Sequence, residues 1–275
     1  MNKHINTVPQ FAVGAWPQWV SLMRFGFKSA VMTKQKLLAV VTLGLLLSLP
    51  GLAQAQYVFT PIDVPGALST GANANSTKDI AGQFDDADGN THGFILSKGS
   101  FSTIDIPGAL FTVINGINAP GRFTGTYADA SGTPHAFVWS KGVFTTIDPP
   151  NGNATLGPVA FGINDPGEVV GTFVDTDGNR HGFVRNKKGI YAMIDVPGAL
   201  FTVAEGINNS GDIVGLYLEM DFTLHGFVLS KAGYATVDVP GSSGTQINSI
   251  NAQGEIAGVY QDADGNNHGF VGVPD

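Results

Sequence analysis

The chain has 275 residues, of which 43% are hydrophobic and only 13% charged, and it contains 37 glycines and 15 prolines. This composition is typical of an all-β protein rich in tight turns and fits the helix-rich classes poorly. The formal net charge is −8 and there is no cysteine, so neither a nucleic-acid-binding surface nor a disulfide framework is expected.

Residues 1–55 predict an N-terminal extension followed by a secretory signal peptide. Two lysines follow Met32 and precede an apolar run over residues 37–49, and small residues lead up to a cleavage site after Ala55. The apolar run is shorter than the roughly 20 residues that a membrane-spanning helix needs. We therefore expect Met32 to be the start, residues 56–275 to be the mature protein, and its location to be secreted, extracellular or periplasmic, without a stable membrane anchor after cleavage.

Cleavage would make the chain more acidic. It removes five of the 14 basic residues and none of the 22 acidic ones, which leaves nine basic residues and a net charge of −13. Nucleic acid and anionic membranes are poor partners for such a surface. Because no disulfide is available, packing must stabilise the fold, and a mature chain of this length is ample for one core.

Internal repeats organise the mature chain. The phrase "TIDIPGAL" or a close variant recurs at spacings of 42 to 47 residues, and its aspartates are Asp63, Asp105, Asp148, Asp195 and Asp238. A second phrase, "GINDPGEVVGTF" at 162, recurs at 116, 206 and 249, with a divergent copy at 73. The third phrase is "HGF", or "HAF" in the second copy, and its histidines are His92, His135, His181, His225 and His268.

Each unit of about 43 residues holds four short β-prone runs separated by turns. In the second unit we expect strands at 112–118, 122–128, 135–140 and 143–148. The turn between the first two runs has the form Asn-x-x-Gly in most units, in which an Asn side chain caps the turn and glycine adopts the left-handed backbone. Four antiparallel strands are the content of one propeller blade.

The two ends of the mature chain complement each other. It opens with a fourth-type run at 57–64 and closes with a third-type run at 268–272, so the fifth unit lacks a last strand and the N-terminus supplies one. The sequence therefore predicts a five-bladed β-propeller over residues 56–275, with four antiparallel strands per blade and the ring closed by the N-terminal strand in the last blade. An open β-solenoid is the alternative.

The repeated "GIN..G.IVG.Y....G..HGF" together with "TID.PGA" resembles the HAF-repeat family of extracellular bacterial proteins, and Ala136 preserves the His-Ala-Phe phrase. The resemblance covers Tyr57 to the C-terminus. It implies secretion and a repeat architecture, and it carries no catalytic residues over to this chain.

In an up-and-down blade, the turn between the second and third strands shares a face with the connection to the next blade. Propellers commonly bind ligands on that face or at the mouth of the channel. Leu110, Phe111, Leu200 and Phe201 lie in these connections. They would be exposed on the binding face or packed between blades, and we favour packing.

The turn "DADGN" that precedes the first "HGF" resembles the start of a calcium loop. Three units carry the acidic version, and the candidate Ca²⁺ ligands are Asp86, Asp88, Asp175, Asp177, Asp262 and Asp264. Units two and four lose part of it, and no unit has the distant glutamate of an EF-hand. Because Asp-Gly is a strong hairpin signal by itself, we favour a turn without metal and expect no cofactor.

The histidine persists in all five units, and the phenylalanine two residues later lies on the same strand face. The five histidines, with Asn115 and Asn248, are therefore candidates for ligand binding. The alternative, which we favour, is a structural histidine whose ring nitrogens bond a neighbouring strand or the repeated aspartate.

An enzymatic function has weaker support. A glycosidase needs two facing carboxylates, and the inward positions before the "GIN" phrase are Ala72, Asn115, Phe161, Glu205 and Asn248. Only Glu205 is acidic, so it is the sole catalytic candidate. The similarity of the units favours a binding or interaction module with up to five similar sites for an extracellular ligand such as a glycan. A glycoside-processing enzyme and a purely structural adhesion scaffold are the alternatives.

Overall fold

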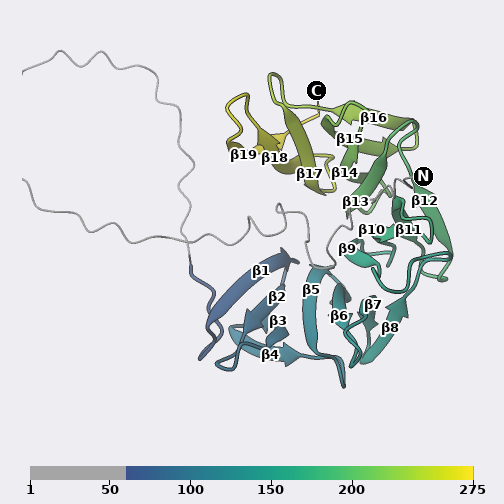
Figure 1. Cartoon of the computed structure of the whole chain (residues 1–275). Coiled ribbons are helices and arrows are strands. Elements are labelled where there is room, and N and C mark those ends of the chain that lie inside the picture. Colours follow the sequence, from purple (N-terminus) through teal and green to yellow (C-terminus); the bar gives the residue numbers. More distant parts are fainter. Residues whose placement is uncertain (1–59, 275) are drawn as a thin grey trace, which may run out of the picture. The chain divides into compact units, whose positions relative to one another are not determined.

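The computed structural model describes residues 60–274, and every regular element within them is a β-strand (Figure 1). The all-β prediction is therefore confirmed. Residues 60–274 contain no helix that is long and apolar enough to cross a membrane. The predicted signal peptide and residues 57–59 of the first predicted strand lie outside the described residues.

The strands fall into five consecutive units that correspond to the sequence repeats. Unit one comprises β1 (Ser69–Asn75), β2 (Asp79–Asp85), β3 (Thr91–Ser97) and β4 (Ser100–Ile104). Unit two comprises β5 (Phe111–Ile117), β6 (Phe123–Ala128), β7 (Pro134–Ser140) and β8 (Val143–Ile147). Unit three comprises β9 (Val159–Ile163), β10 (Val169–Val174), β11 (Arg180–Arg185) and β12 (Tyr191–Ile194). Unit four comprises β13 (Phe201–Ile207), β14 (Ile213–Leu218), β15 (Leu224–Ser230) and β16 (Gly233–Val237), and unit five comprises β17 (Gly244–Ile250), β18 (Ile256–Gln261) and β19 (Asn267–Gly272).

Within each unit, successive strands pair antiparallel. Units one, two and three form separate four-stranded sheets. Units four and five are joined into one seven-stranded sheet by a single parallel pairing of Leu224 with Gly244. The strands of unit two agree with the predicted runs to within one or two residues. Unit five has only three strands within residues 60–274, and residues 60–64 belong to no strand.

A phenylalanine and a glycine from neighbouring strands form the centre of each unit. In unit two, Phe137 of β7 is fully buried and lies over Gly125 of β6, where an added Cβ would be 2.8 Å from the Phe137 ring and 2.0 Å from the carbonyl oxygen of Val113. No side chain fits there, which explains the repeated glycine of "GTY" and "GTF". The equivalent buried residues are Phe94, Phe183 and Phe227.

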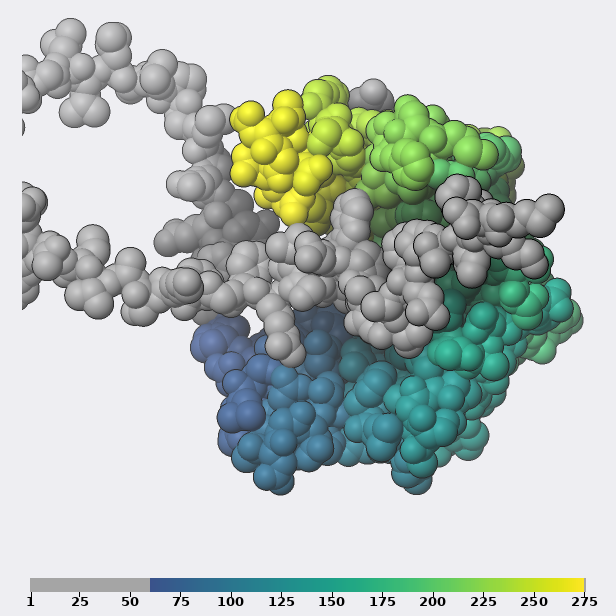
Figure 2. Space-filling model, viewed as in Figure 1, coloured from purple at the N-terminus to yellow at the C-terminus, as the bar shows by residue number. Residues whose placement is uncertain are grey.

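Neighbouring units pack through the first strand of each unit. The strands β5, β9, β13 and β17 lie against the strands of the preceding unit, and in Figure 2 the units follow one another in chain order from blue to yellow. Each first strand carries a β-bulge. In unit one the bulged residue is Asn73, one residue after Ala72, which was the inward position expected from the sequence. The amide of Asn73 donates to the carbonyl oxygen of Ile114 at 2.9 Å, which links units one and two. A bulge thus aims a polar side chain at the next unit.

Candidate functional site

The repeated histidine is held between two aspartates, an arrangement that we call the His–Asp clamp. In unit three, Nδ1 of His181 lies 3.0 Å from a carboxylate oxygen of Asp195, at the end of β12. Its Nε2 lies 3.1 Å from Asp175, in the turn between β10 and β11. The clamp therefore ties that hairpin turn to the end of the fourth strand. The bond to the repeated aspartate, expected from the sequence, is present.

The clamp differs among the units. In unit one, His92 lies 2.9 Å from Asp105 and 3.1 Å from Asp86. In unit two, the contacts of His135 are longer, at 3.4 Å to Asp129 and 3.6 Å to Asp148. In unit four, Nδ1 of His225 lies 2.7 Å from Asp238, and in unit five Nε2 of His268 lies 2.8 Å from Asp262. For His225 and His268, no partner of the second ring nitrogen is found within residues 60–274.

The histidines are neither buried nor fully exposed. Their side chains are 19% to 27% exposed in units one to four and 45% exposed in unit five. Burial lowers the pKa of His181, but the hydrogen bonds and charges of Asp175 and Asp195 outweigh it, so that the net shift of this pKa is upward. The backbone of Asn179 and then the ring of His181 lower the pKa of Asp175 to about 2. Both pKa shifts favour the pair of a protonated His181 and an ionised Asp175. This ion pair holds the hairpin turn against the third strand of the unit.

The acidic turns use their oxygens within the turn. Oδ1 of Asp175 accepts the backbone N–H groups of Asp177 and Asn179, at 2.9 and 2.8 Å, while Oδ2 contacts the Asn179 amide and His181. Asp86 and Asp262 make the same contacts, and the remaining candidates Asp88, Asp177 and Asp264 are exposed on their turns. Within residues 60–274 no three His, Cys, Asp or Glu side chains are grouped so that they could hold a metal ion. The geometry supports the hairpin-turn interpretation.

A cleft of about 250 Å³ lies beside the clamp of unit two. Its walls come from the start of β7, with Thr133, Pro134 and His135, and from the connection at 148–158, with Asp148 and Pro158. This connection is longer than the others, and it closes onto β7 so tightly that a Cβ on Gly157 would lie 2.1 Å from the carbonyl oxygen of Pro134. The sequence signal was available in the spacing of 47 residues between Asp148 and Asp195, but we did not predict a cleft from it.

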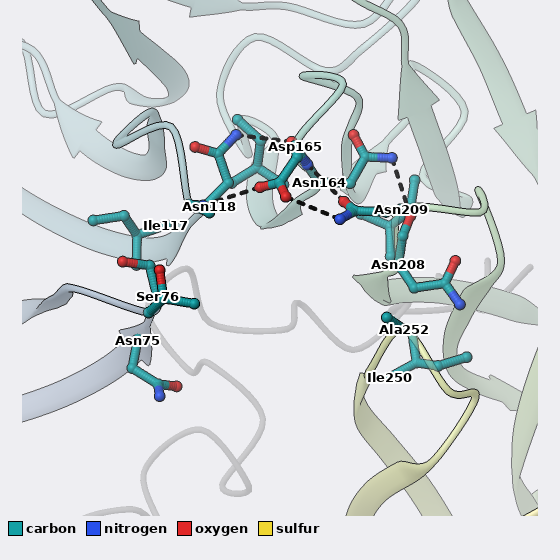
Figure 3. A pocket seen from close by; sticks show the side chains of 14 residues that line it. Asn75, Ser76, Ile117, Asn118, Asn164, Asp165, Asn208, Asn209, Ile250 and Ala252 are labelled. Atoms are coloured by element: carbon teal, nitrogen blue, oxygen red, sulfur yellow. Dashed lines mark hydrogen bonds between the residues drawn. The ribbon is translucent and has the colours of Figure 1, made fainter.

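A second cavity, of about 480 Å³, lies where the turns between first and second strands of all five units meet (Figure 3). The side chains of Asn118, Asn164 and Asn208 are buried there, and each amide donates to a backbone carbonyl of the next unit. Asp165 and Asn209 add a bond at 2.9 Å between their side chains. The polar groups that line this cavity bond one another across neighbouring units. We therefore interpret the cavity as a contact region between units rather than as a ligand site.

The remaining candidates lie on the bulges of the first strands. The amide of Asn115 donates to the carbonyl oxygen of Ala160 at 2.9 Å, which makes it an inter-unit fastener. The Oδ1 atom of Asn248 is buried and has no hydrogen-bond partner among residues 60–274. Burial raises the pKa of Glu205 to about 7, against the opposing hydrogen bond from Gln246. The other bulge positions hold no second carboxylate, and neither cavity includes Glu205.

The leucines of the inter-unit connections lie on the face that carries the clamps. We expected Leu110 and Leu200 to pack between blades, and this prediction is wrong, because Leu110 is 60% and Leu200 is 39% exposed. Leu68, in the equivalent position before unit one, is also exposed. The backbone N–H of each leucine bonds the end of the following second strand, which turns the side chain outward. Phe111 and Phe201 are partly buried.

Comparison with known proteins gives no family assignment. No protein-family model and no curated protein sequence matches this chain. Among solved structures, a fucose-specific lectin from Aleuria aurantia is similar with a TM-score of 0.43 and 12% identity, over 74% of this chain and 76% of that chain. The BP39L lectin from Burkholderia pseudomallei gives a TM-score of 0.42 and 13% identity, over 78% and 70%. At these TM-scores the likeness assigns neither a ligand nor a number of blades.

Proposed function

We propose that this protein is a secreted binding module for a polyhydroxylated extracellular ligand such as a glycan. The observation that carries the proposal is the cleft of unit two, on the face that the clamps and inter-unit connections share. Ligand sites are concave and place a few polar groups within apolar walls. This cleft has that composition, with His135 and Asp148 as polar groups and prolines as the apolar wall.

The chemistry of the cleft suits a sugar ring. Asp148 has a side chain that is 64% exposed, so its carboxylate can accept hydroxyl protons, and the looser contacts of His135 leave its ring nitrogens the most available in units one to three. Sugar C–H groups can pack on Pro134 and Pro158. The volume of about 250 Å³ is below that of pockets for drug-sized molecules, which favours one monosaccharide unit over an oligosaccharide.

A glycan array followed by calorimetric titration of methyl glycosides tests this function. Filling the cleft with Ala154→Trp should weaken binding at least tenfold, whereas Thr155→Trp, one residue away and outside the cleft, should retain it. Equal binding by both variants would remove the cleft from the proposal. An array without hits, together with strong self-association, would favour the adhesion scaffold. The number of sugars bound per chain tests the multivalent version with up to five similar sites, which one site per chain contradicts.

Asp63 makes no bond to His268 within residues 60–274. We further propose that the five units close into a five-bladed propeller, in which Asp63 approaches His268 and completes the fifth clamp. In units one to four, Nδ1 of the histidine faces the repeated aspartate that ends the fourth strand of its own unit. Unit five has no such strand within residues 60–274, and His268 is the most exposed of the five histidines. Asp63 precedes Val64, whose N–H bonds Thr70 Oγ1 at 3.0 Å, as Val196 bonds Thr202 after Asp195.

A double-mutant cycle tests this closure. If Asp63 pairs with His268, then Asp63→Ala and His268→Ala should be non-additive in the free energy of unfolding, with a coupling of about 1 kcal/mol. The control cycle combines Asp63→Ala with His225→Ala and should be additive. Additivity in both cycles contradicts closure through Asp63. Membership of the HAF-repeat family and secretion remain part of the proposal, and signal-peptide cleavage is tested by N-terminal sequencing of the exported protein.

A further inference from the structure

The turn between β14 and β15 departs from its counterparts in the other units. The second-to-last residue of this turn before β15 is Phe222, which has a positive φ of 66°. The equivalent residues are glycines in every other unit, with φ between 85° and 92°, namely Gly89, Gly132, Gly178 and Gly265. The turns are the same in their bonding, because Phe222 N–H donates to Glu219 at 3.0 Å as Gly89 N–H donates to Asp86 at 3.1 Å. Only unit four places a bulky side chain at this left-handed position.

The local packing does not explain Phe222. A bulky residue with positive φ is an energetic outlier, and such residues persist where something else over-determines them. The Phe222 side chain is 77% exposed, and Met220 beside it is 71% exposed. Leu200 is brought to the same end of the hairpin because its backbone N–H donates to the carbonyl oxygen of Leu218 at 2.7 Å. Unit four therefore presents an apolar platform of Phe222, Met220 and Leu200 to solvent.

The clamp of the same unit is half open. Nδ1 of His225 is held by Asp238 at 2.7 Å, and the ring stacks on Tyr217 with centroids 5.2 Å apart. Glu219 occupies the turn position that holds the second aspartate in the other units, and within residues 60–274 it makes no bond to His225. The Nε2 atom is thus left for another partner. Glu219 and Asp221 add two exposed carboxylates to the same turn.

We propose that this turn is a second sugar-binding site, in which Phe222 stacks on the apolar C–H face of a pyranose while hydroxyls bond the Asp221 and Glu219 carboxylates and Nε2 of His225. The inference rests on the proposed function and deepens it, because it names an open stacking site besides the enclosed cleft of unit two. Aromatic rings favour ligands that join an apolar face to polar edges. Two carboxylates beside the ring disfavour an apolar protein surface, which could not solvate them.

The test is Phe222→Gly, which restores the residue of the other four units. The variant should unfold at a higher temperature, because glycine relieves the left-handed strain, and it should bind sugar at least tenfold more weakly at this site. Binding is measured by ¹H–¹⁵N NMR titration with methyl β-D-galactopyranoside, methyl α-L-fucopyranoside and methyl β-D-glucopyranoside. Ile190→Gly is the matched control, because Ile190 is 62% exposed in the turn before β12 at the other end of its unit, and Phe222→Tyr should retain binding.

The outcomes separate this site from the function as a whole. Loss of the shifts of residues 219–225 in Phe222→Gly, with those of the unit-two cleft retained, supports the proposal. Unchanged shifts at 219–225 in Phe222→Gly, or no such shifts in the wild type while the cleft responds, overturn this site and leave the proposed function standing. No response of the wild type to any of the three glycosides overturns both. Lower self-association of Phe222→Gly with unchanged sugar binding would assign the platform to a second copy of the chain and also overturn the proposal.

Discussion

Replacing His181 with glutamine should destabilise the protein in a pH-dependent way. The change removes the cation from the clamp of unit three, which has contacts of 3.0 and 3.1 Å to its two aspartates. Hydrogen bonds to charged groups contribute about 1.5–3 kcal/mol, and partly exposed ion pairs contribute less. We expect a loss of about 1 kcal/mol in the free energy of unfolding at pH 5.5, or roughly 2–4 °C in Tm for a domain of this size.

The sign of the pH dependence follows from the raised pKa of His181. A group whose pKa is higher in the folded state stabilises the fold fully below its unfolded pKa of about 6.5, and this contribution is lost as the pH rises through the folded pKa. Asp175 stays ionised over this range because its pKa is lowered to about 2. Above the folded pKa the neutral ring donates to one aspartate only, while its other nitrogen directs a lone pair at the second.

Thermal unfolding followed by circular dichroism between pH 5.5 and 8.5 measures the effect. The difference in Tm between wild type and His181→Gln should be largest at pH 5.5 and shrink toward pH 8.5. The same change at His135, with contacts of 3.4 and 3.6 Å, is the control and should cost less. A difference that is constant with pH, or that grows toward pH 8.5, would refute the charged clamp.

Three further predictions probe the fold, the first of them with a control variant. Gly171→Ala should prevent folding or cost several kcal/mol, because its Cβ would lie 2.1 Å from the carbonyl oxygen of Val159; Gly178→Ala, with open space around it, should cost about 1–2 kcal/mol in denaturant unfolding. Glu205→Gln should stabilise the protein at pH 8 but not at pH 4, because a carboxyl whose pKa is raised to about 7 destabilises the fold as the pH rises from 4.5 through 7; equal effects at both values, measured by urea titration, would contradict this. Asn164→Ala removes a turn cap and an inter-unit donor and should lower Tm by about 4–8 °C, for a loss of about 2 kcal/mol; a shift below 1 °C would show that water replaces both bonds.

The repeats predicted the strands well, because period and turn chemistry are local properties of the sequence. The buried phenylalanine of "HGF" and the Asn-x-x-Gly turn follow directly from residue type. Features that depend on contacts between units were less accessible. The packing of Leu110 was predicted wrongly, because its direction depends on a backbone bond to the end of the next strand rather than on hydrophobicity. In unit one the residue equivalent to Asn115 is Asn73 rather than Ala72, because the turn from Asn75 to its partner Ile80 is one residue shorter than the turn from Ile117 to Phe123.

The candidate site was predicted only in part. The pairing of His181 with Asp195 was weighed from the sequence, since both residues recur in phase. The cleft beside His135 and the exposed Phe222 each occur in one unit only. Reasoning from the residues that all units share therefore does not find them. The sequence does contain their signals, in the longer connection after Asp148 and in a phenylalanine where the other units have glycine. The exposure of Phe222 depends on a left-handed backbone at that position, and the cleft depends on how the connection after Asp148 folds onto β7. Residue type alone specifies neither.

The amide chain through Asn118, Asn164 and Asn208 has a direction, since each side chain donates to the unit that follows it. During synthesis the N-terminal units emerge first. The asparagine amide of each unit therefore has no acceptor until the carbonyl group of the next unit has been synthesised. Folding should therefore lag synthesis by one unit of about 43 residues, and a nascent chain should always end in one incompletely fastened repeat. Duplication of an internal unit would preserve this order of donors and acceptors, which gives a physical route by which such a chain can lengthen.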